Sequence, residues 1–321
     1  MENFLIDVVR RAVRGRGLSR KTENAYVNHT RQFLKFIGRC DAESAGVSEM
    51  GAFLKYLEKD KHFAAATENQ VLCALAFFYR EAFGRDILPC LKNIKRTRTN
   101  DEKPPVILTS AEVRAVLSQL HGAPFLVAAL MYGSGLRLNE ALNLRVGDVN
   151  FRRREIFVRE IRTGTKDHRT ILPEIIIARL EKHLRQVKFL HEDDCLRGFG
   201  KMVLPPVLAQ ISPEADSQWC WQYVFPAAKL SPNEKRTSFY RRHLAASTVQ
   251  KAVGEAIERA KVVKKAGCQT LRHSFAVRIF EKTRDIYAVS NLLGHKNLRA
   301  TLVYTNAVKR ATGFSSPLDM V

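Results

Sequence analysis

Hydrophobic residues recur at three- and four-residue intervals through the first ninety positions, which is the spacing of amphipathic helices. Ser19 is suited to cap one of these helices, and Gly84 follows the last of them. The residues that share a face in three successive segments are Tyr26, Thr30, Phe33, Phe36 and Ile37, then Met50, Phe53, Leu54 and Leu57, then Val71, Leu72, Leu75, Phe78, Tyr79 and Ala82. We therefore expect residues 1–92 to form a small helical domain.

This periodic pattern stops at a basic segment. Residues 91–105 contain five Lys and Arg residues, no sustained apolar stripe and a double proline, which favours an extended linker over residues 93–105. Such a linker either lies along a phosphate backbone or is a solvated connector, and the sequence leaves both readings open. A second domain is expected over residues 106–321.

The second domain is expected to be mostly helical. Thr109-Ser-Ala-Glu112 is a capping-box pattern that begins one helix, and an apolar run over residues 125–132 predicts another that ends at Gly133. Later helical stripes are formed by Val249, Ala252, Val253, Ala256 and Ile257, and by Ile286, Val289, Leu292 and Leu293 before Gly294. Between about residues 190 and 245 the chain is predicted to be irregular, and it is rich in aromatic side chains.

One β-hairpin interrupts these helices. Residues 155–159 and 169–172 are typical of strands, Thr163-Gly164 supplies the chemistry of a turn, and Pro173 opens the next helix. The sequence therefore predicts a mainly α protein of the α+β class. Its two parts are a helical N-terminal domain and a mixed, mostly helical domain with a small hairpin.

The charge of the chain is unusual in sign. Its 321 residues include 53 Lys and Arg against 32 Asp and Glu, a net charge of +21 and a pI of about 10.0. This excess indicates a polyanionic partner, with nucleic acid ahead of an anionic membrane surface. No signal peptide or membrane-spanning run is recognisable, so we expect a cytoplasmic protein. The six cysteines lack a C-x-x-C pair, which argues against a structural zinc site.

Four residues of the second domain suit phosphoryl transfer at a phosphodiester. Arg137 and Arg272 supply guanidinium forks for the non-bridging oxygens, His295 a further donor, and Tyr304 a nucleophile. Each residue alone has an ordinary structural explanation. Arg137 could form a salt bridge with Glu140, His295 could lie at a helix end, and Tyr304 could be a core aromatic residue. The prediction of phosphoryl transfer therefore depends on all four residues together.

The four surrounding segments, Gly133–Glu140, Leu271–Ala276, Leu293–His295 and Val303–Thr305, resemble in order and spacing the motifs of the tyrosine recombinases. The resemblance implies an N-terminal SAM-like core-binding domain that clamps DNA and a C-terminal catalytic domain. It implies that Tyr304 attacks the scissile phosphate to form a 3′-phosphotyrosine, while Arg137, Arg272 and His295 stabilise the transition state. It also implies that no metal or other cofactor is needed.

A narrower resemblance comes from the aromatic segment at about 190–245. Leu204–Leu208, Trp221–Pro226, Arg241–His243 and Gln250–Ala252 are similar to the extra segment of the integron integrases. The resemblance implies that Trp221, Arg241, Arg242 and His243 contact bases protruding from a folded single-stranded cassette site. The implied function is integration and excision of gene cassettes. The implied partners are this folded site, a double-stranded integron site, and further subunits that complete a tetramer on DNA.

The chain departs from the family pattern at two catalytic positions. Arg162 occupies the apparent place of a lysine in the hairpin turn, and arginine is a poor general acid because its pKa exceeds 12. Lys166 is close enough in sequence to replace it, and the choice between the two stays open. Gln269 stands where the family has the first histidine of a His-x-x-Arg motif, and glutamine cannot take up a proton. These changes predict reduced turnover.

Two alternatives to the integron assignment follow. One is a catalytically impaired relative that binds DNA without efficient cleavage, and the other is a duplex-specific recombinase of the phage or Xer type. The apolar tail residues Phe314, Leu318 and Met320 are expected either to dock on a neighbouring subunit or to stay with their own.

Overall fold

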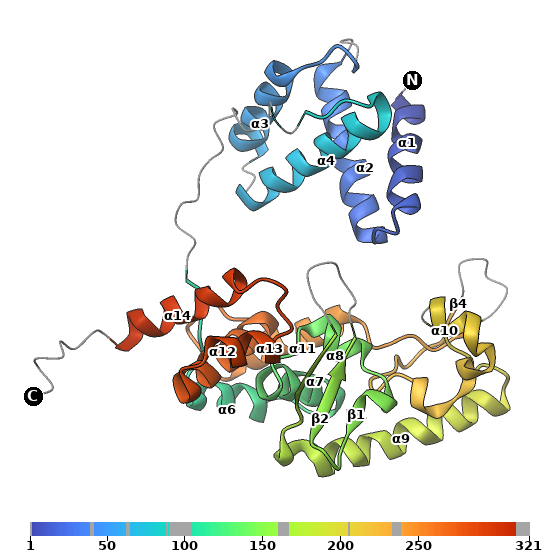
Figure 1. Cartoon of the computed structure of the whole chain (residues 1–321), viewed down its shortest axis with the longest axis vertical. Helices are drawn as coiled ribbons and strands as arrows, with labels where there is room; N and C mark the ends of the chain where they lie inside the picture. Colours follow the sequence, from blue (N-terminus) through green and yellow to red (C-terminus); the bar gives the residue numbers. More distant parts are fainter. Residues whose placement is uncertain are drawn as a thin grey trace, which may run out of the picture. The chain divides into compact units, whose positions relative to one another are not determined.

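The chain divides into two compact units, residues 1–103 and 104–321 (Figure 1). The computed structural model describes residues 2–38, 42–61, 65–87, 89, 104–159, 167–204, 206–232 and 239–312. Each unit has its own hydrophobic core. The predicted fold class, a helical N-terminal domain followed by a mostly helical domain with small sheets, is confirmed.

The first unit is built from four helices in its described residues. They are α1 (Glu2–Gly15), α2 (Arg20–Ile37), α3 (Val47–Lys61) and α4 (Ala65–Phe83). The predicted cap of α2 is confirmed, because the Ser19 hydroxyl accepts a hydrogen bond from the backbone N–H of Thr22 at 3.1 Å. The predicted faces are mostly buried, whereas Phe36 is 39% exposed at the edge of its face.

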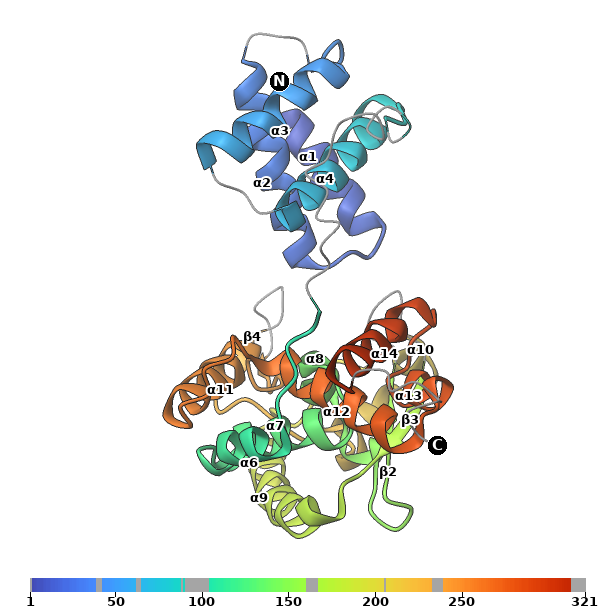
Figure 2. The same cartoon turned by 90° about the vertical axis from the view of Figure 1, so that its left-hand side faces the viewer.

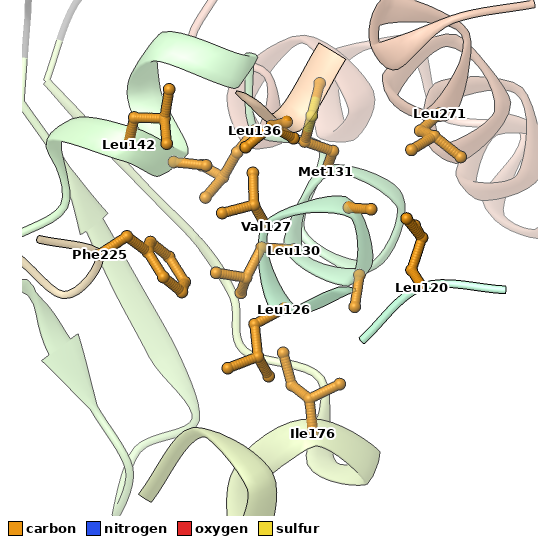
Figure 3. Packing of buried hydrophobic residues seen from close by; sticks show 14 of the residues in the cluster. Leu120, Leu126, Val127, Leu130, Met131, Leu136, Leu142, Ile176, Phe225 and Leu271 are labelled. Atoms are coloured by element: carbon orange, nitrogen blue, oxygen red, sulfur yellow. The ribbon is translucent and has the colours of Figure 1, made fainter. Parts of the chain in front are cut away.

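In the second unit, the long apolar helix α7 lies at the centre of the core. The helices of its first half are α6 (Ser110–Ser118), α7 (Gly122–Gly133), α8 (Leu138–Asn143) and α9 (Ile177–Leu196). Figure 3 shows apolar side chains of α7 surrounded by side chains of neighbouring segments, among them Leu120, Leu142, Ile176, Phe225 and Leu271. The Thr109 capping box that begins α6 is present as predicted.

The predicted hairpin is part of a three-stranded antiparallel sheet. Its order is β1 (Val149–Asn150), β2 (Glu155–Val158) and β3 (His168–Ile171). Val158 pairs with His168, so the end of β2 lies directly beside the start of β3. β1 is an addition to the prediction, and residues 160–166, where the turn is predicted, lie outside the described residues. The Thr170 hydroxyl donates to the carbonyl of Ser134 at 2.7 Å, which ties β3 to the end of α7.

The segment predicted to be irregular from residue 190 begins later than expected. Helix α9 continues to Leu196, so the first residues of that span are regular helix. Beyond it come α10 (Pro206–Ile211), the 3₁₀ turns Pro213–Ser217 and Trp219–Trp221, and the paired strands β4 (Ser231–Pro232) and β5 (Phe239–Tyr240).

The last four helices complete the second unit. They are α11 (Ala246–Arg259), α12 (Cys268–Thr283), α13 (Ile286–Leu292) and α14 (Arg299–Thr312). Helices α12, α13 and α14 pack against one another, as Figure 2 shows, and α12 also packs on α7. The tail that contains Phe314, Leu318 and Met320 lies outside the described residues. No helix among the described residues is long and apolar enough to span a membrane.

Candidate functional site

Arg137 is presented at the point where α7 turns into α8. Gly135 in this turn has a φ of +70°, a conformation that a side chain would strain. A Cβ at this position would also lie 2.4 Å from the ring of Phe275, so the turn needs glycine for two separate reasons. Arg137 itself is the residue that precedes α8, and its side chain is 29% exposed. The turn therefore places a partly accessible guanidinium beside α12.

Glu140, in the first turn of α8, is shared by two arginines. Its carboxylate accepts from the Arg137 guanidinium at 2.6 Å and from the Arg137 backbone N–H at 2.7 Å. It also accepts from the Arg272 guanidinium at 3.1 Å. One buried carboxylate thus holds two guanidiniums together, and the three groups keep a net positive charge suited to a phosphate anion. Sequence reasoning had placed Glu140 only as an ion-pair partner of Arg137.

Arg272, on α12, is buried with only 1% of its side chain exposed. Besides Glu140, its guanidinium donates to the carbonyls of Gly135 at 2.7 Å and Leu293 at 2.9 Å. Burial and the neighbouring charge of Arg137 lower the pKa of Arg272 to about 10, so it stays charged at neutral pH. These contacts fix the orientation of the guanidinium before any ligand arrives.

His295 follows a tight turn at the end of α13. Gly294 has a φ of +63°, and a Cβ there would come 2.3 Å from the ring of His168 on β3. The His295 Nε2 atom lies 3.2 Å from the Arg272 guanidinium, and its Nδ1 atom lies 2.8 Å from the Thr301 hydroxyl. Burial, with the charge of Arg272, lowers the pKa of His295 to about 4, so the ring is neutral at neutral pH.

Tyr304 projects from α14 into the same cluster and is only 4% exposed. Its hydroxyl oxygen lies 3.0 Å from the Nδ1 atom of His273, which directly follows Arg272 on α12. Burial raises the pKa of Tyr304, while the charges of Arg272 and Arg137 oppose that rise. The structure therefore gathers the four predicted residues Arg137, Arg272, His295 and Tyr304 around one point.

Two of the other predicted positions, Arg162 and Lys166, lie outside the described residues. Gln269 is exposed on the first turn of α12, four residues before His273 and therefore on the same face of that helix. His273 itself was missed by sequence reasoning, although it stands inside the motif that carries Arg272.

A second feature is a groove of about 720 Å³ beside the aromatic segment. Arg145, Tyr223, Tyr240, Arg242 and His243 contribute polar and aromatic side chains to its lining. The Arg145 guanidinium stacks 3.7 Å from the centre of the Tyr223 ring, and the Tyr223 and His243 rings meet edge to face at 5.4 Å. Such a surface offers aromatic faces and cationic donors together, the combination that binds unpaired bases.

Two of the four residues predicted to contact bases, Arg242 and His243, line this groove. The Nδ1 atom of His243 lies 2.8 Å from its neighbour's carbonyl, that of Leu244, and Arg242 donates to the hydroxyl of Tyr240 at 2.8 Å. Tyr223 and Arg145 were not anticipated. Tyr223 stands within the Trp221–Pro226 motif, so the aromatic content of that motif was the available signal.

Arg241 has a different environment from Arg242. Its guanidinium donates to both carboxylate oxygens of Asp194, at 2.5 and 2.7 Å, and to the carbonyls of Ala227 and Ala228. The side chains of this pair are 11% and 4% exposed. In this arrangement Arg241 fastens the segment that carries Arg242 to α9, and a base contact by Arg241 would require these bonds to break.

Trp221, the last of the four, is part of a small cluster beside the groove rather than its lining. It packs against the apolar side chains of Met202, Leu204 and Ala215. The Arg159 guanidinium lies 4.9 Å from the centre of a Trp221 ring, and it also pairs with Asp148 at 2.6 Å. The indole is therefore partly packed and partly available.

The profile of the phage integrase family matches residues 107–310, and the profile of its N-terminal SAM-like domain matches residues 5–88. The chain belongs to the phage integrase family, the tyrosine recombinases. Two curated relatives named "Integrase/recombinase", from Escherichia coli and Pseudomonas aeruginosa, are each 36% identical over 316 residues, covering 98% of this chain and 93% of the relative. Membership supports site-specific recombination as the class of activity.

Solved structures of this class share the fold. The XerH site-specific recombinase bound to a palindromic difH substrate in a post-cleavage complex has a TM-score of 0.63 at 19% identity, covering 98% of this chain and 84% of that one. The Tn1549 transposon integrase in complex with circular intermediate DNA has a TM-score of 0.64 at 17% identity, with coverages of 98% and 97%. At sequence identities below 20%, this structural similarity is evidence for a shared fold.

Proposed function

We propose that this protein is an integron integrase, a site-specific recombinase that cleaves and rejoins DNA to integrate or excise gene cassettes. Its substrates would be a folded single-stranded cassette site and a double-stranded integron site. The assignment to the integron integrases rests on the aromatic segment and its groove, whereas the assignment of recombinase chemistry rests on the cluster around Tyr304.

The observation that carries the chemistry is the pairing of Arg137 and Arg272 on Glu140, next to the Tyr304 hydroxyl. Two guanidiniums held by one carboxylate form a fork for the non-bridging oxygens of a phosphodiester. Because the fork is fixed before DNA binds, little reorganisation is needed as charge develops on the phosphate. This geometry supports phosphoryl transfer.

In the proposed reaction the Tyr304 oxygen attacks the scissile phosphorus, and the 5′ oxygen of the next nucleotide leaves. The product is a 3′-phosphotyrosine and a free 5′ hydroxyl, which conserves the energy of the bond without ATP or a metal. Arg137 and Arg272 bind the phosphate oxygens, and His295 lies beside them to contribute a further hydrogen bond. Arg162 or Lys166, both outside the described residues, would protonate the leaving oxygen.

The groove beside the aromatic segment supports the choice of a folded single strand. An unpaired base exposes its ring faces, and stacking on an aromatic side chain contributes about 1–3 kcal/mol for each base. His243, Arg242 and Tyr223 lie where such a base would enter, and we propose that Trp221 stacks on a second protruding base. We assign Arg241 to positioning the protein segment that carries Arg242 and His243 rather than to direct contact with a base.

The basic charge and the two-unit organisation support a clamp on DNA. The net charge of +21 gives a salt-sensitive attraction to phosphates that is independent of sequence. Recombination joins two sites, each with two half-sites, so four subunits would assemble on the DNA. We propose this tetramer as the working state in the cytoplasm.

The direct test is a covalent-adduct assay on a suicide substrate, using a folded bottom-strand cassette site and a duplex of the same sequence. The wild-type protein is expected to form an adduct, with preference for the folded site, and Tyr304→Phe is expected to form none. An adduct formed by Tyr304→Phe would overturn the nucleophile assignment. Equal or greater activity on the duplex would favour a phage- or Xer-type recombinase.

The catalytically impaired alternative is favoured by two residues, Arg162 and Gln269. Losing a general acid or base costs about 10²–10⁴-fold in rate. The variant Arg162→Lys/Gln269→His is therefore expected to increase adduct formation if the cluster aligns Tyr304 with the phosphate. Tight DNA binding with no adduct in either the wild type or this variant would establish the non-cleaving alternative.

A further inference from the structure

His273 is in direct contact with the Tyr304 hydroxyl, and no role assigned above accounts for it. The Nδ1 atom of His273 lies 3.0 Å from the Tyr304 oxygen. The two rings are 5.6 Å apart between their centres and inclined by 48°. Because helices α12 and α14 pack together here, both side chains are held in place by the fold.

The charge beside the hydroxyl favours one direction for this hydrogen bond. Arg272 favours the ionised form of Tyr304, because its positive charge lies close to the phenol oxygen. Donation from the Tyr304 O–H to the Nδ1 atom of His273 shifts electron density toward that oxygen, so we assign Tyr304 as the donor and His273 as the acceptor. A neutral ring that accepts at Nδ1 carries its proton at Nε2.

The surroundings of His273 keep it in the accepting form. Burial, with the charge of Arg272, lowers the pKa of His273 to about 4. The ring is neutral at pH 7 and has a lone pair available at Nδ1. Gln269, one helical turn earlier on the same face of α12, is exposed and has no group that can take up a proton.

We propose that His273 is a catalytic residue that takes the proton of Tyr304 during attack on the phosphate. The proposal rests on the recombinase function above and names the base for its first step. The O–H bond of Tyr304 breaks, its proton passes to Nδ1 of His273, and the oxygen forms a bond to phosphorus. The P–O5′ bond breaks, and the 5′ oxygen keeps that electron pair and gains a proton from the acid or from water. Rejoining reverses each step, so the imidazolium of His273 returns its proton to Tyr304.

The arriving phosphate strengthens His273 as a base. The charge of Arg272 is one cause of the low pKa of His273 in the DNA-free protein. A phosphodiester bound to Arg272 brings a negative charge that offsets this effect, so the proton affinity of His273 rises when substrate is bound. The same arginine favours ionisation of Tyr304, so one contact assists both ends of the proton transfer.

The decisive variant is His273→Asn. An asparagine oxygen can stand near the place of Nδ1 and accept a hydrogen bond, yet it cannot be protonated. Single-turnover adduct formation is expected to slow by about 10²–10⁴-fold at pH 7. Its rate should then rise about tenfold for each pH unit between 7 and 9, because Tyr304 must lose its proton to solvent. The wild-type rate should be nearly level over that range. His121→Asn, at an exposed position before α7, is the matched control.

Two outcomes with His273→Asn would overturn the role of His273 without touching the recombinase function. In the first, the variant has the same rate and pH profile as an active wild type. In the second, its rate is reduced by the same factor at every pH, which would make His273 a residue that positions Tyr304 rather than a base. A wild type that forms no adduct with either substrate would instead count against the recombinase function. For that case ¹⁵N NMR of the DNA-free protein shows independently which ring nitrogen of His273 carries the proton. We expect the proton at Nε2 and none at Nδ1, and a proton at Nδ1 would refute the assignment of His273 as the base.

Discussion

The guanidinium of Arg272 donates a hydrogen bond to the Nε2 atom of His295, over 3.2 Å. Since arginine can only donate, His295 Nε2 is unprotonated here, and its Nδ1 atom is left to donate to Thr301. The same guanidinium is also bonded to Gly135, Glu140 and Leu293. These four bonds use both terminal nitrogens of the guanidinium, so a bound phosphate must either exchange with one of these partners or accept from the Nε–H group. His295 needs a proton at Nε2 before it can donate to the phosphate.

The depressed pKa of His295 predicts a measurable dependence of stability on pH. Its pKa is about 4 in the folded protein, against an ordinary value of 6.5. Between these values the unfolded chain binds more protons than the folded one, so the contribution of His295 to stability is present above pH 6.5 and is lost as the pH falls toward 4. The Tm of His295→Gln should therefore fall less steeply than that of the wild type between pH 7 and pH 4.5.

Calorimetry of both proteins across this range checks the prediction, because the carboxylates contribute equally to the two curves. His121→Gln, a change at an exposed histidine, controls for the substitution itself. Parallel Tm curves for the wild type and His295→Gln would contradict the buried neutral state of His295.

Glu140→Gln tests whether the shared carboxylate holds the arginine fork. The substitution keeps the shape of the side chain but leaves Arg272 buried without its counter-charge. Breaking a buried pair in this way costs about 3–5 kcal/mol in the free energy of unfolding. Adduct formation should also fall by at least about tenfold, because the two guanidiniums lose their common anchor.

The matched control is Glu174→Gln, which removes the partner of Arg154 in an exposed pair with side chains 69% and 56% exposed. Its cost in unfolding free energy should be at most about 1 kcal/mol. Denaturant titration of both variants gives the comparison. If the two losses are equal, Glu140 is not the anchor described here.

The sequence was informative where local rules decide the structure. The caps at Ser19 and Thr109 and the paired strands follow from neighbouring residues, and the structure has them as predicted. The contact between His273 and Tyr304 joins residues 31 positions apart, and the Asp194–Arg241 pair joins residues 47 apart. Nothing local distinguishes these partners, because their meeting depends on how whole helices pack. Arg241 and Arg242 are adjacent and chemically identical, yet only the fold separates their environments.

Gly135→Ala tests the turn that presents Arg137. The new Cβ would strain a φ of +70° and would lie 2.4 Å from the Phe275 ring. We expect the free energy of unfolding to fall by about 2–5 kcal/mol. Gly254→Ala, inside α11, would place its Cβ more than 4 Å from every atom outside its immediate helix backbone, and should instead raise stability by about 0.5–1 kcal/mol. Opposite signs in thermal denaturation are the expected result, and a neutral Gly135→Ala would contradict it.

Asp194→Asn tests whether the pair with Arg241 positions the groove. Loss of the carboxylate leaves the Arg241 guanidinium buried without its counter-charge, so the segment that carries Arg242 and His243 should loosen from α9. We expect affinity for a folded site with protruding bases to fall by about tenfold or more, roughly 1.4 kcal/mol. Binding of a fully paired duplex should change little, because it has no protruding base to enter the groove and the arginine fork on Glu140 makes no contact with this pair.

The neighbouring substitution Asp193→Asn is the control for this experiment. Asp193 pairs with Arg197 on the same helix, and both side chains are more than half exposed, at 57% and 56%. It makes the same change in charge one residue away, so any purely electrostatic effect on DNA binding should appear in both variants. Gel-shift titrations with the folded and duplex sites give the two affinities for each protein. If Asp193→Asn and Asp194→Asn weaken folded-site binding equally, the groove does not depend on the Arg241 anchor.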